Sequence, residues 1–232
     1  MSLDQARHRV ILVEILRDIF TNPITSGALG FKGGTAAYLF HGLNRFSVDL
    51  DFDLLDPSLT DIVFDELKAL LLRHGNLKLA DKKRYSLIFI LDYIDKASGA
   101  QNVKLEVNLR NFNSRYEVQQ YLGIPMRVMV REDMAANKLV ACYERIGKTN
   151  RDLYDCYFFL SRHWPINQKI IENRTGKGYS EFLADLLDSV EQMKSRSILA
   201  GMGELLDEKQ KSWVRNHLKE ELLFQIRLLQ TK

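Results

Sequence analysis

Hydrophobic and polar positions divide the chain into a first half of mixed patterns and a second half dominated by helical spacing. Apolar residues three and four positions apart indicate amphipathic helices, and strict alternation indicates strands with one buried face. The pattern predicts helices at 4–21, 34–42 and 59–74, strands at 47–54, 76–82, 85–93 and 102–110, and helices from about 132 to the end. We therefore expect an α+β protein, with a mixed sheet and flanking helices in residues 1–125 and a mainly helical domain in residues 126–232.

The strand predicted at 47–54 carries three acids on one face. Residues two apart on a strand point the same way, so Asp49, Asp51 and Asp53 share a side with Ser47. Carboxylates this close repel one another unless a cation compensates. Mg²⁺ is the obvious candidate, because it prefers one or two carboxylates together with waters and phosphate oxygens. The alternative is a solvated edge strand whose charges discourage pairing with another sheet.

A Gly-Gly turn precedes these acids by the length of one helix. Gly33 and Gly34 permit backbone angles closed to other residues and the close approach of a phosphate. Thr35 is expected to cap the following helix, whose N-terminus attracts anions. A simple turn is the alternative for the glycines alone, but their pairing with the acids favours a phosphate cradle beside a metal site.

These two motifs together resemble a known family. A Gly-Gly-Thr turn, a short helix and Asp-x-Asp form the signature of the polymerase-beta-like nucleotidyltransferases. The longer string KGGTAAYLFHGLNRFSVDLDF is similar to the AbiEii/AbiGii nucleotidyltransferase toxins. The resemblance covers about residues 30 to 160 and implies a nucleotidyltransferase-like sheet, a helical C-terminal domain that contributes to the active-site cleft, and transfer of a nucleoside monophosphate from an NTP to an acceptor hydroxyl.

The resemblance also implies roles for particular residues. Asp49 and Asp51 would bridge two Mg²⁺ ions, and Glu106 would hold the ion that activates the acceptor hydroxyl. Gly33, Gly34 and Thr35 would bind the β- and γ-phosphates, with Ser47 as a further nucleotide contact. Glu106 lies on an alternating strand, where a solvated glutamate is the alternative interpretation.

Two residues of the helical half, Lys138 and Asp152, complete the expected catalytic set. Lys138 lies beside an apolar helical stripe and is expected to bring its ammonium to the triphosphate; an ordinary surface lysine is the alternative. Asp152 and Asp155 share a helical face. In one interpretation Asp152 lies near the nucleotide or near Lys138. In the other, both are acids favoured by the N-terminus of their helix, and Arg151 pairs with Asp155.

Other polar residues near these motifs have weaker assignments. Asp53 is expected to support the metal-binding acids or to be solvated, and is not assigned a catalytic role. Arg45 reaches either a phosphate or an aspartate. Lys104 and Arg110 share the predicted face of Glu106 and balance its charge.

Composition narrows the class of protein further. The chain has 232 residues and a net charge of +3, so it is no general polyanion binder. No apolar run is long enough for a membrane span, and charges interrupt the N-terminal helix too often for a signal peptide. We expect a cytoplasmic protein with Cys142 and Cys156 as buried free thiols.

The leading functional hypothesis is a Mg²⁺-dependent nucleotidyltransferase toxin that acts on RNA, such as a tRNA end. Basic residues from Arg127 to Arg151 would receive the RNA phosphates. The toxin-like family also implies a possible antitoxin partner. The alternatives are a nucleotide- or partner-binding module without transfer activity, and a transferase that modifies a protein hydroxyl.

Overall fold

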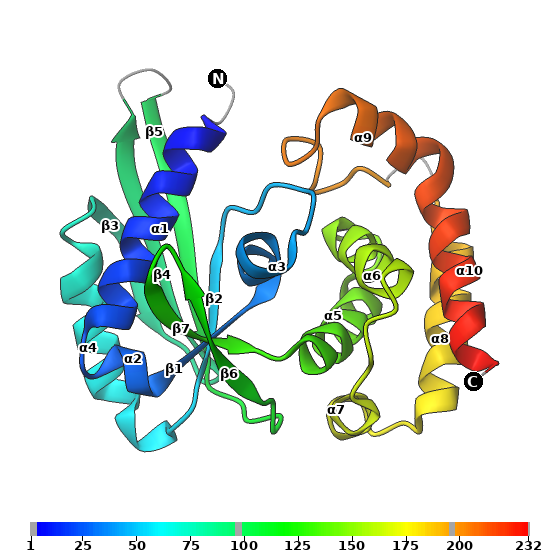
Figure 1. Cartoon of the computed structure of the whole chain (residues 1–232), viewed down its shortest axis with the longest axis horizontal. Coiled ribbons are helices and arrows are strands. Elements are labelled where there is room, and N and C mark those ends of the chain that lie inside the picture. The colour runs from blue at the N-terminus through cyan, green and yellow to red at the C-terminus, as the bar shows by residue number, and fades with distance from the viewer. Residues whose placement is uncertain (1–3, 96–98, 195–197, 232) are drawn as a thin grey trace. The chain divides into compact units, whose positions relative to one another are not determined.

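The computed structural model describes residues 4–95, 99–194 and 198–231 (Figure 1). The chain forms two compact units, one from residues 1–111 and 115–129 and the other from residues 112–114 and 130–232. The change of unit, expected after residue 125, falls at residue 129, because the strand that ends there is part of the sheet.

The described part of the first unit contains a seven-stranded mixed sheet in the order β3-β4-β5-β2-β1-β7-β6. β2 runs parallel to β5 and antiparallel to β1, and β1 runs parallel to β7. The strands are β1 (Leu29–Lys32), β2 (Leu50–Leu54), β3 (Asn76–Lys82), β4 (Ser86–Asp95), β5 (Gly99–Asn108), β6 (Tyr116–Tyr121) and β7 (Ile124–Met129).

One face of this sheet is apolar and is covered by helices α1 (Gln5–Thr21) and α4 (Thr60–Leu71). The ring of Phe20 on α1 contacts Phe31 and Phe52 of β1 and β2, and Phe64 on α4 contacts Phe89 of β4. Phe31 and Phe52 are register partners and fully buried. Burial of these aromatic side chains contributes to the stability of this unit.

The opposite face carries the polar residues of β1, β2 and β5. Lys32, Asp51 and Glu106 are consecutive register partners across these three strands. The next row along the strands is Gly30, Asp53 and Asn108. Because side chains alternate between the faces of a strand, burying Phe31 and Phe52 on one side places both polar rows on the other.

The second unit is helical in its described part. Its helices are α5 (Arg131–Arg145), α6 (Arg151–Ser161), α7 (Gln168–Thr175), α8 (Tyr179–Gln192), α9 (Glu208–Trp213) and α10 (Lys219–Gln230), with a π-helical turn (Val214–Leu218) before α10. The segment Phe112–Ser114 joins this unit, because Arg174 stacks on Phe112 and Asn137 donates a hydrogen bond to Ser114 Oγ at 3.1 Å.

The structure confirms the predicted fold class and most of the long elements. The strand predicted at 47–54 is shorter, because only residues 50–54 pair with neighbouring strands. β4 has a nearly all-apolar sequence from Ser86 to Leu91, which is typical of a central strand, but it lies one strand from the edge, and its described residues alternate between buried and half-buried. The prediction missed several short elements, among them α2 (Thr25–Ala28), β1, β6 and β7.

Two expectations that depend on composition also have structural outcomes. Cys142 and Cys156 are free and buried, as predicted. Within the described residues, no helix combines the length and the hydropathy needed to cross a membrane.

A buried histidine supports the segment that leads into β2. His8 of α1 donates from Nε2 to the carbonyl oxygen of Val48 at 3.0 Å and accepts at Nδ1 from the Tyr93 hydroxyl at 2.7 Å. A carbonyl can only accept, so Nε2 carries a hydrogen, and in the neutral ring Nδ1 is then the acceptor. Burial lowers the pKa of His8, although the Val48 carbonyl opposes that effect.

We predict that the stability contributed by neutral His8 is present above the unfolded histidine pKa of about 6.5 and is lost as the pH falls below it. The unfolded chain binds the proton first, so acidification favours unfolding. Urea midpoints measured at about pH 7.5 and about pH 5.5 should therefore fall further for the wild type than for His8→Gln. Equal losses in the two proteins would contradict this role of His8.

Candidate active site

The site begins at the N-terminus of helix α3 (Gly33–His41), directly after β1. Gly33 has φ of +79°, and a Cβ atom there would lie 2.9 Å from Asp51 Cβ and 3.0 Å from Asp51 Cγ. Only glycine fits this position, because its backbone is left-handed and the Asp51 side chain lies against it. The turn therefore places the carboxylate of Asp51 beside the first amide groups of the helix.

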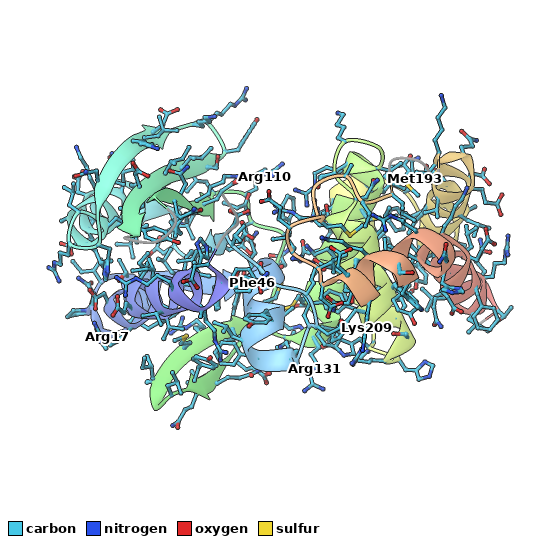
Figure 2. The ribbon with its side chains drawn as sticks, turned by 90° about the horizontal axis from the view of Figure 1, so that it is seen from above. Arg17, Phe46, Arg110, Arg131, Met193 and Lys209 are labelled. Carbon is cyan, nitrogen blue, oxygen red and sulfur yellow. The ribbon has the colours of Figure 1, made fainter. Side chains whose placement is uncertain are left out.

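Gly34 is equally close to two side chains of the segment before β2. A Cβ at Gly34 would lie 2.8 Å from Arg45 Nη2 and 2.9 Å from Ser47 Oγ. Arg45 is buried and donates to the carbonyl oxygen of Phe46 at 2.9 Å. Figure 2 labels Phe46, whose ring packs edge-on against Tyr38 of α3. The second glycine thus admits a guanidinium and a hydroxyl to the helix N-terminus.

The expected capping role of Thr35 is wrong. The N-cap of α3 is Lys32, without a side-chain cap, and Thr35 lies inside the first turn. Its buried hydroxyl is hydrogen-bonded to Ser47 Oγ at 2.9 Å and to the carbonyl oxygen of Asp49. Thr35 therefore ties α3 to the chain that enters β2, and only its backbone amide points to phosphate binding.

Asp51 and Glu106 are brought together by strand pairing. They are register partners on parallel neighbours, and strands lie about 4.8 Å apart, so their side chains leave the polar face side by side. Lys104 lies 2.5 Å from Glu106 Oε2. Asp49 precedes the first paired residue of β2, so strand alternation does not fix the direction of its side chain.

These residues can supply part of the coordination shell of a divalent metal ion. In the described part of the chain, no group of three or more His, Cys, Asp or Glu side chains is arranged to hold an ion. Asp51 and Glu106 nevertheless form a carboxylate pair, and Mg²⁺ needs only one or two carboxylates when waters and phosphates complete its shell. The donor set therefore fits Mg²⁺ better than a metal enclosed by protein ligands alone.

Asp53 has a different environment from the other acids. It accepts hydrogen bonds from Lys32 Nζ at 2.5 Å, from Asn108 Nδ2 at 2.7 Å and from the Tyr116 hydroxyl. The residue is buried. It is therefore not a solvated acid, and its contacts support the expected role in holding the neighbouring charges.

The second unit contains a buried charge cluster on α5 and α6. Lys138 Nζ lies 2.9 Å from Asp152 Oδ1 and 3.0 Å from Asp155 Oδ2. Arg145 Nη2 lies 2.8 Å from Asp152 Oδ2. Both aspartates are buried, and the Lys138 side chain is 11% exposed. Lys138 is thus no ordinary surface lysine, and Asp152 lies next to it, as one of the two interpretations predicted.

The thiol of Cys156 lies against the backbone of this cluster. The Cys156 thiol donates to the carbonyl oxygen of Lys138 at 3.5 Å, and burial raises the pKa of Cys156 well above its ordinary value. The apolar stripe of α5 is buried at Ala135, Leu139 and Cys142. Ile146, the next apolar residue at helical spacing, is the C-cap, because the helix ends at Arg145.

Three residues of the site were not assigned roles from the sequence: Lys32, Asn108 and Tyr116. Lys32 stands in the Lys-Gly-Gly-Thr string, but β1 was not recognised, so its partner strand was unknown. Asn108 follows Glu106 by two residues, and this spacing was the available signal for a shared face. Tyr116 had no sequence signal, because its contact with Asp53 spans 63 positions.

Comparisons with known proteins agree with this geometry. The family model described as "Nucleotidyl transferase AbiEii toxin, Type IV TA system" matches residues 14–219. The chain belongs to the AbiEii family. It is a nucleotidyltransferase of a toxin family, which implies a nucleotide substrate and an antitoxin. A search of curated protein sequences found no match.

Solved structures share the fold of this AbiEii protein. JHP933 from Helicobacter pylori has a TM-score of 0.66 at 23% identity, with 100% of this chain and 94% of that chain covered. MenT4, a nucleotidyltransferase toxin from Mycobacterium tuberculosis, has a TM-score of 0.55 at 18% identity, with 97% and 93% covered. These similarities confirm the expected arrangement of a mixed sheet with flanking helices.

We predict that Gly33→Ala lowers the transfer rate about 100-fold, because the new methyl group displaces the Asp51 carboxylate. Gly42→Ala is the matched control. Gly42 also has a positive φ, of +68°, but a Cβ there would meet nothing within 4 Å. Its substitution should cost about 1 kcal/mol of stability and leave the rate nearly unchanged. Equal rate losses, measured with labelled NTP, would show that backbone strain alone matters.

We also predict that Lys138→Met lowers the free energy of unfolding by about 3 to 5 kcal/mol, because two buried carboxylates lose their shared cation. Adding Asp155→Asn should restore part of the loss. Lys148→Met, at an exposed position, should change stability by less than about 0.5 kcal/mol. Wild-type stability of Lys138→Met in urea unfolding would exclude a structural role for Lys138.

Proposed function

We propose that this AbiEii protein transfers a nucleoside monophosphate from an NTP to a hydroxyl of RNA, with Mg²⁺ as its cofactor. The observation that carries the proposal is the strand register that puts Asp51 beside Glu106 while the Gly33 turn puts Asp51 against the N-terminus of α3. Carboxylates for a metal and amides for a phosphate thus meet at one point of the first unit.

The first unit supplies the groups that would bind the triphosphate. The amides of Gly33, Gly34 and Thr35 open α3, where the helix dipole favours negative charge. Arg45 and Ser47 lie against Gly34 and add a positive charge and a hydroxyl. The low exposure of Arg45 strengthens its attraction to an anion, because buried charges are less screened than exposed ones.

Asp49, Asp51 and Glu106 would hold the metal. Bound Mg²⁺ would neutralise the phosphates and activate the acceptor hydroxyl for in-line displacement. The acceptor oxygen then bonds to the α-phosphorus, the bond to the β-phosphate oxygen breaks, pyrophosphate leaves, and the hydroxyl proton passes to water. For this arrangement, Glu106 exchanges Lys104 for the metal, which is feasible because the Lys104 side chain is 42% exposed.

The second unit is the proposed source of further cationic contacts. Lys138 carries its ammonium on a buried pair of aspartates, which fixes its position. Arg131 and Lys148 are exposed and provide positive charge for RNA phosphates. The main support for an RNA acceptor is membership of the AbiEii family, and the labelling experiment described next identifies the acceptor. Restraint by an antitoxin is part of the same proposal.

The test is to incubate the protein with Mg²⁺, each α-labelled NTP, and total cellular RNA and protein. Asp51→Asn and Glu106→Gln should each reduce labelling at least about 100-fold, because each removes one carboxylate of the pair. Asp61→Asn is the control, since Asp61 is an acid on α4 whose side chain is 84% exposed. It should label at the wild-type rate.

The labelled product decides the acceptor. Label in RNA that requires Asp51 supports the proposal, and label in protein redirects it to a protein hydroxyl. Nucleotide binding without labelling of any acceptor would favour a binding module. Labelling that survives both substitutions would refute the assignment of Asp51 and Glu106.

A further inference from the structure

The buried carboxylate of Asp53 accepts hydrogen bonds from three other strands. Lys32 comes from β1, Asn108 from β5 and Tyr116 from β6. Asn108 Nδ2 also donates to the carbonyl oxygen of Arg110 at 2.7 Å, which fixes the amide. The ring of Tyr116 reaches Asp53 across Gly30, where a Cβ would lie 2.6 Å from Tyr116 Cζ. Asp53 is therefore held in one position.

The carboxylate that pairs with Lys32 is not the one opposite it in the strand register. It is the register partner of Asp51, and Cβ atoms of such partners lie about 4.5 to 5.5 Å apart. Its ammonium nevertheless lies 2.5 Å from Asp53 Oδ1, one row further along the polar face. The Lys32 side chain is only 22% exposed, so water does little to screen its charge.

We propose that Asp53 is a positioning residue that holds the Lys32 ammonium away from Asp51. The inference rests on the proposed function, in which Asp51 binds a divalent metal. A lysine ammonium and a metal ion compete for the same carboxylate oxygens. Asp53 takes up the lysine charge, and Lys32 in turn compensates the buried charge of Asp53.

The arrangement also accounts for two features outside the metal-binding acids. Tyr116 and Asn108 donate to Asp53, so it can hold Lys32 without itself moving toward Asp51. Gly30 leaves room for the Tyr116 ring. If Asp53 loses its charge, Lys32 is expected to turn to the carboxylate of Asp51, its register partner, and the metal must then displace the lysine.

The experiment is a double-mutant cycle in which Mn²⁺ binding is read from the electron paramagnetic resonance signal of the free ion. Wild type, Asp53→Asn, Lys32→Met and the double variant are compared, with Mn²⁺ alone and with an α,β-methylene NTP analogue. Asp53→Asn should weaken Mn²⁺ binding about tenfold. The double variant should bind at least as tightly as the wild type, because the competing ammonium is gone.

A milder variant keeps the test independent of folding. Tyr116→Phe removes one hydrogen bond from Asp53 and should weaken Mn²⁺ binding in the same direction, by about threefold, with no effect once Lys32 is replaced. Near-ultraviolet circular dichroism verifies that each variant is folded. If Asp53→Asn does not fold, the comparison of Tyr116→Phe in the two backgrounds decides the question.

Three outcomes overturn this inference alone. Asp53→Asn could weaken binding equally with and without Lys32, which would make Asp53 a ligand or a purely structural residue. Lys32→Met alone could weaken Mn²⁺ binding tenfold in the presence of the NTP analogue, which would make Lys32 a phosphate contact. If Asp53→Asn bound Mn²⁺ as tightly as the wild type, Lys32 would not compete with the metal for Asp51. A wild type that binds no Mn²⁺ in either condition would instead refute the proposed function together with this inference.

Discussion

Repulsion between acids on one face of the sheet is the constraint on which the rest of the site depends. Asp51 and Glu106 are neighbours in register, and Asp53 lies two residues beyond Asp51. Like charges at this spacing destabilise a sheet unless cations compensate them. Lys32 compensates Asp53 and Lys104 compensates Glu106. Holding these carboxylates together requires the two lysines and the hydrogen bond from Tyr116. It also requires glycine at position 30, against which the Tyr116 ring lies, and at position 33, against which the Asp51 side chain lies.

The helical unit also holds two acids close together, and there the acids are buried and share one cation. Asp152 and Asp155 are both inaccessible to solvent, and Lys138 lies between them. Desolvating such a group of charges is costly, so it adds little net stability, but removing one member leaves the others uncompensated. The cluster consequently fixes the position of one ammonium group.

Long periodic segments of the fold were predictable, and short strands were not. The apolar positions of α1, α4 and β5 repeat often enough to identify each element from sequence alone. β1 has four residues, and β6 exposes much of its length at the edge of the sheet. Neither has a periodicity that distinguishes it from a loop. Their hydrogen-bond partners lie in distant parts of the chain, and those partners make them strands.

The sequence by itself determined the chemistry of this protein: the Gly-Gly turn, the alternating acids and the family to which they belong. These are local patterns, set by backbone freedom at glycine and by the period of a strand. Tertiary structure alone decided which carboxylates are neighbours and which cation each one receives. Asp51 meets Glu106 through strand pairing, and Asp53 meets Tyr116 through a side-chain hydrogen bond that spans β1 and β7; both contacts join residues more than fifty positions apart. The register between strands decides which distant side chains become neighbours, and no local sequence pattern specifies that register.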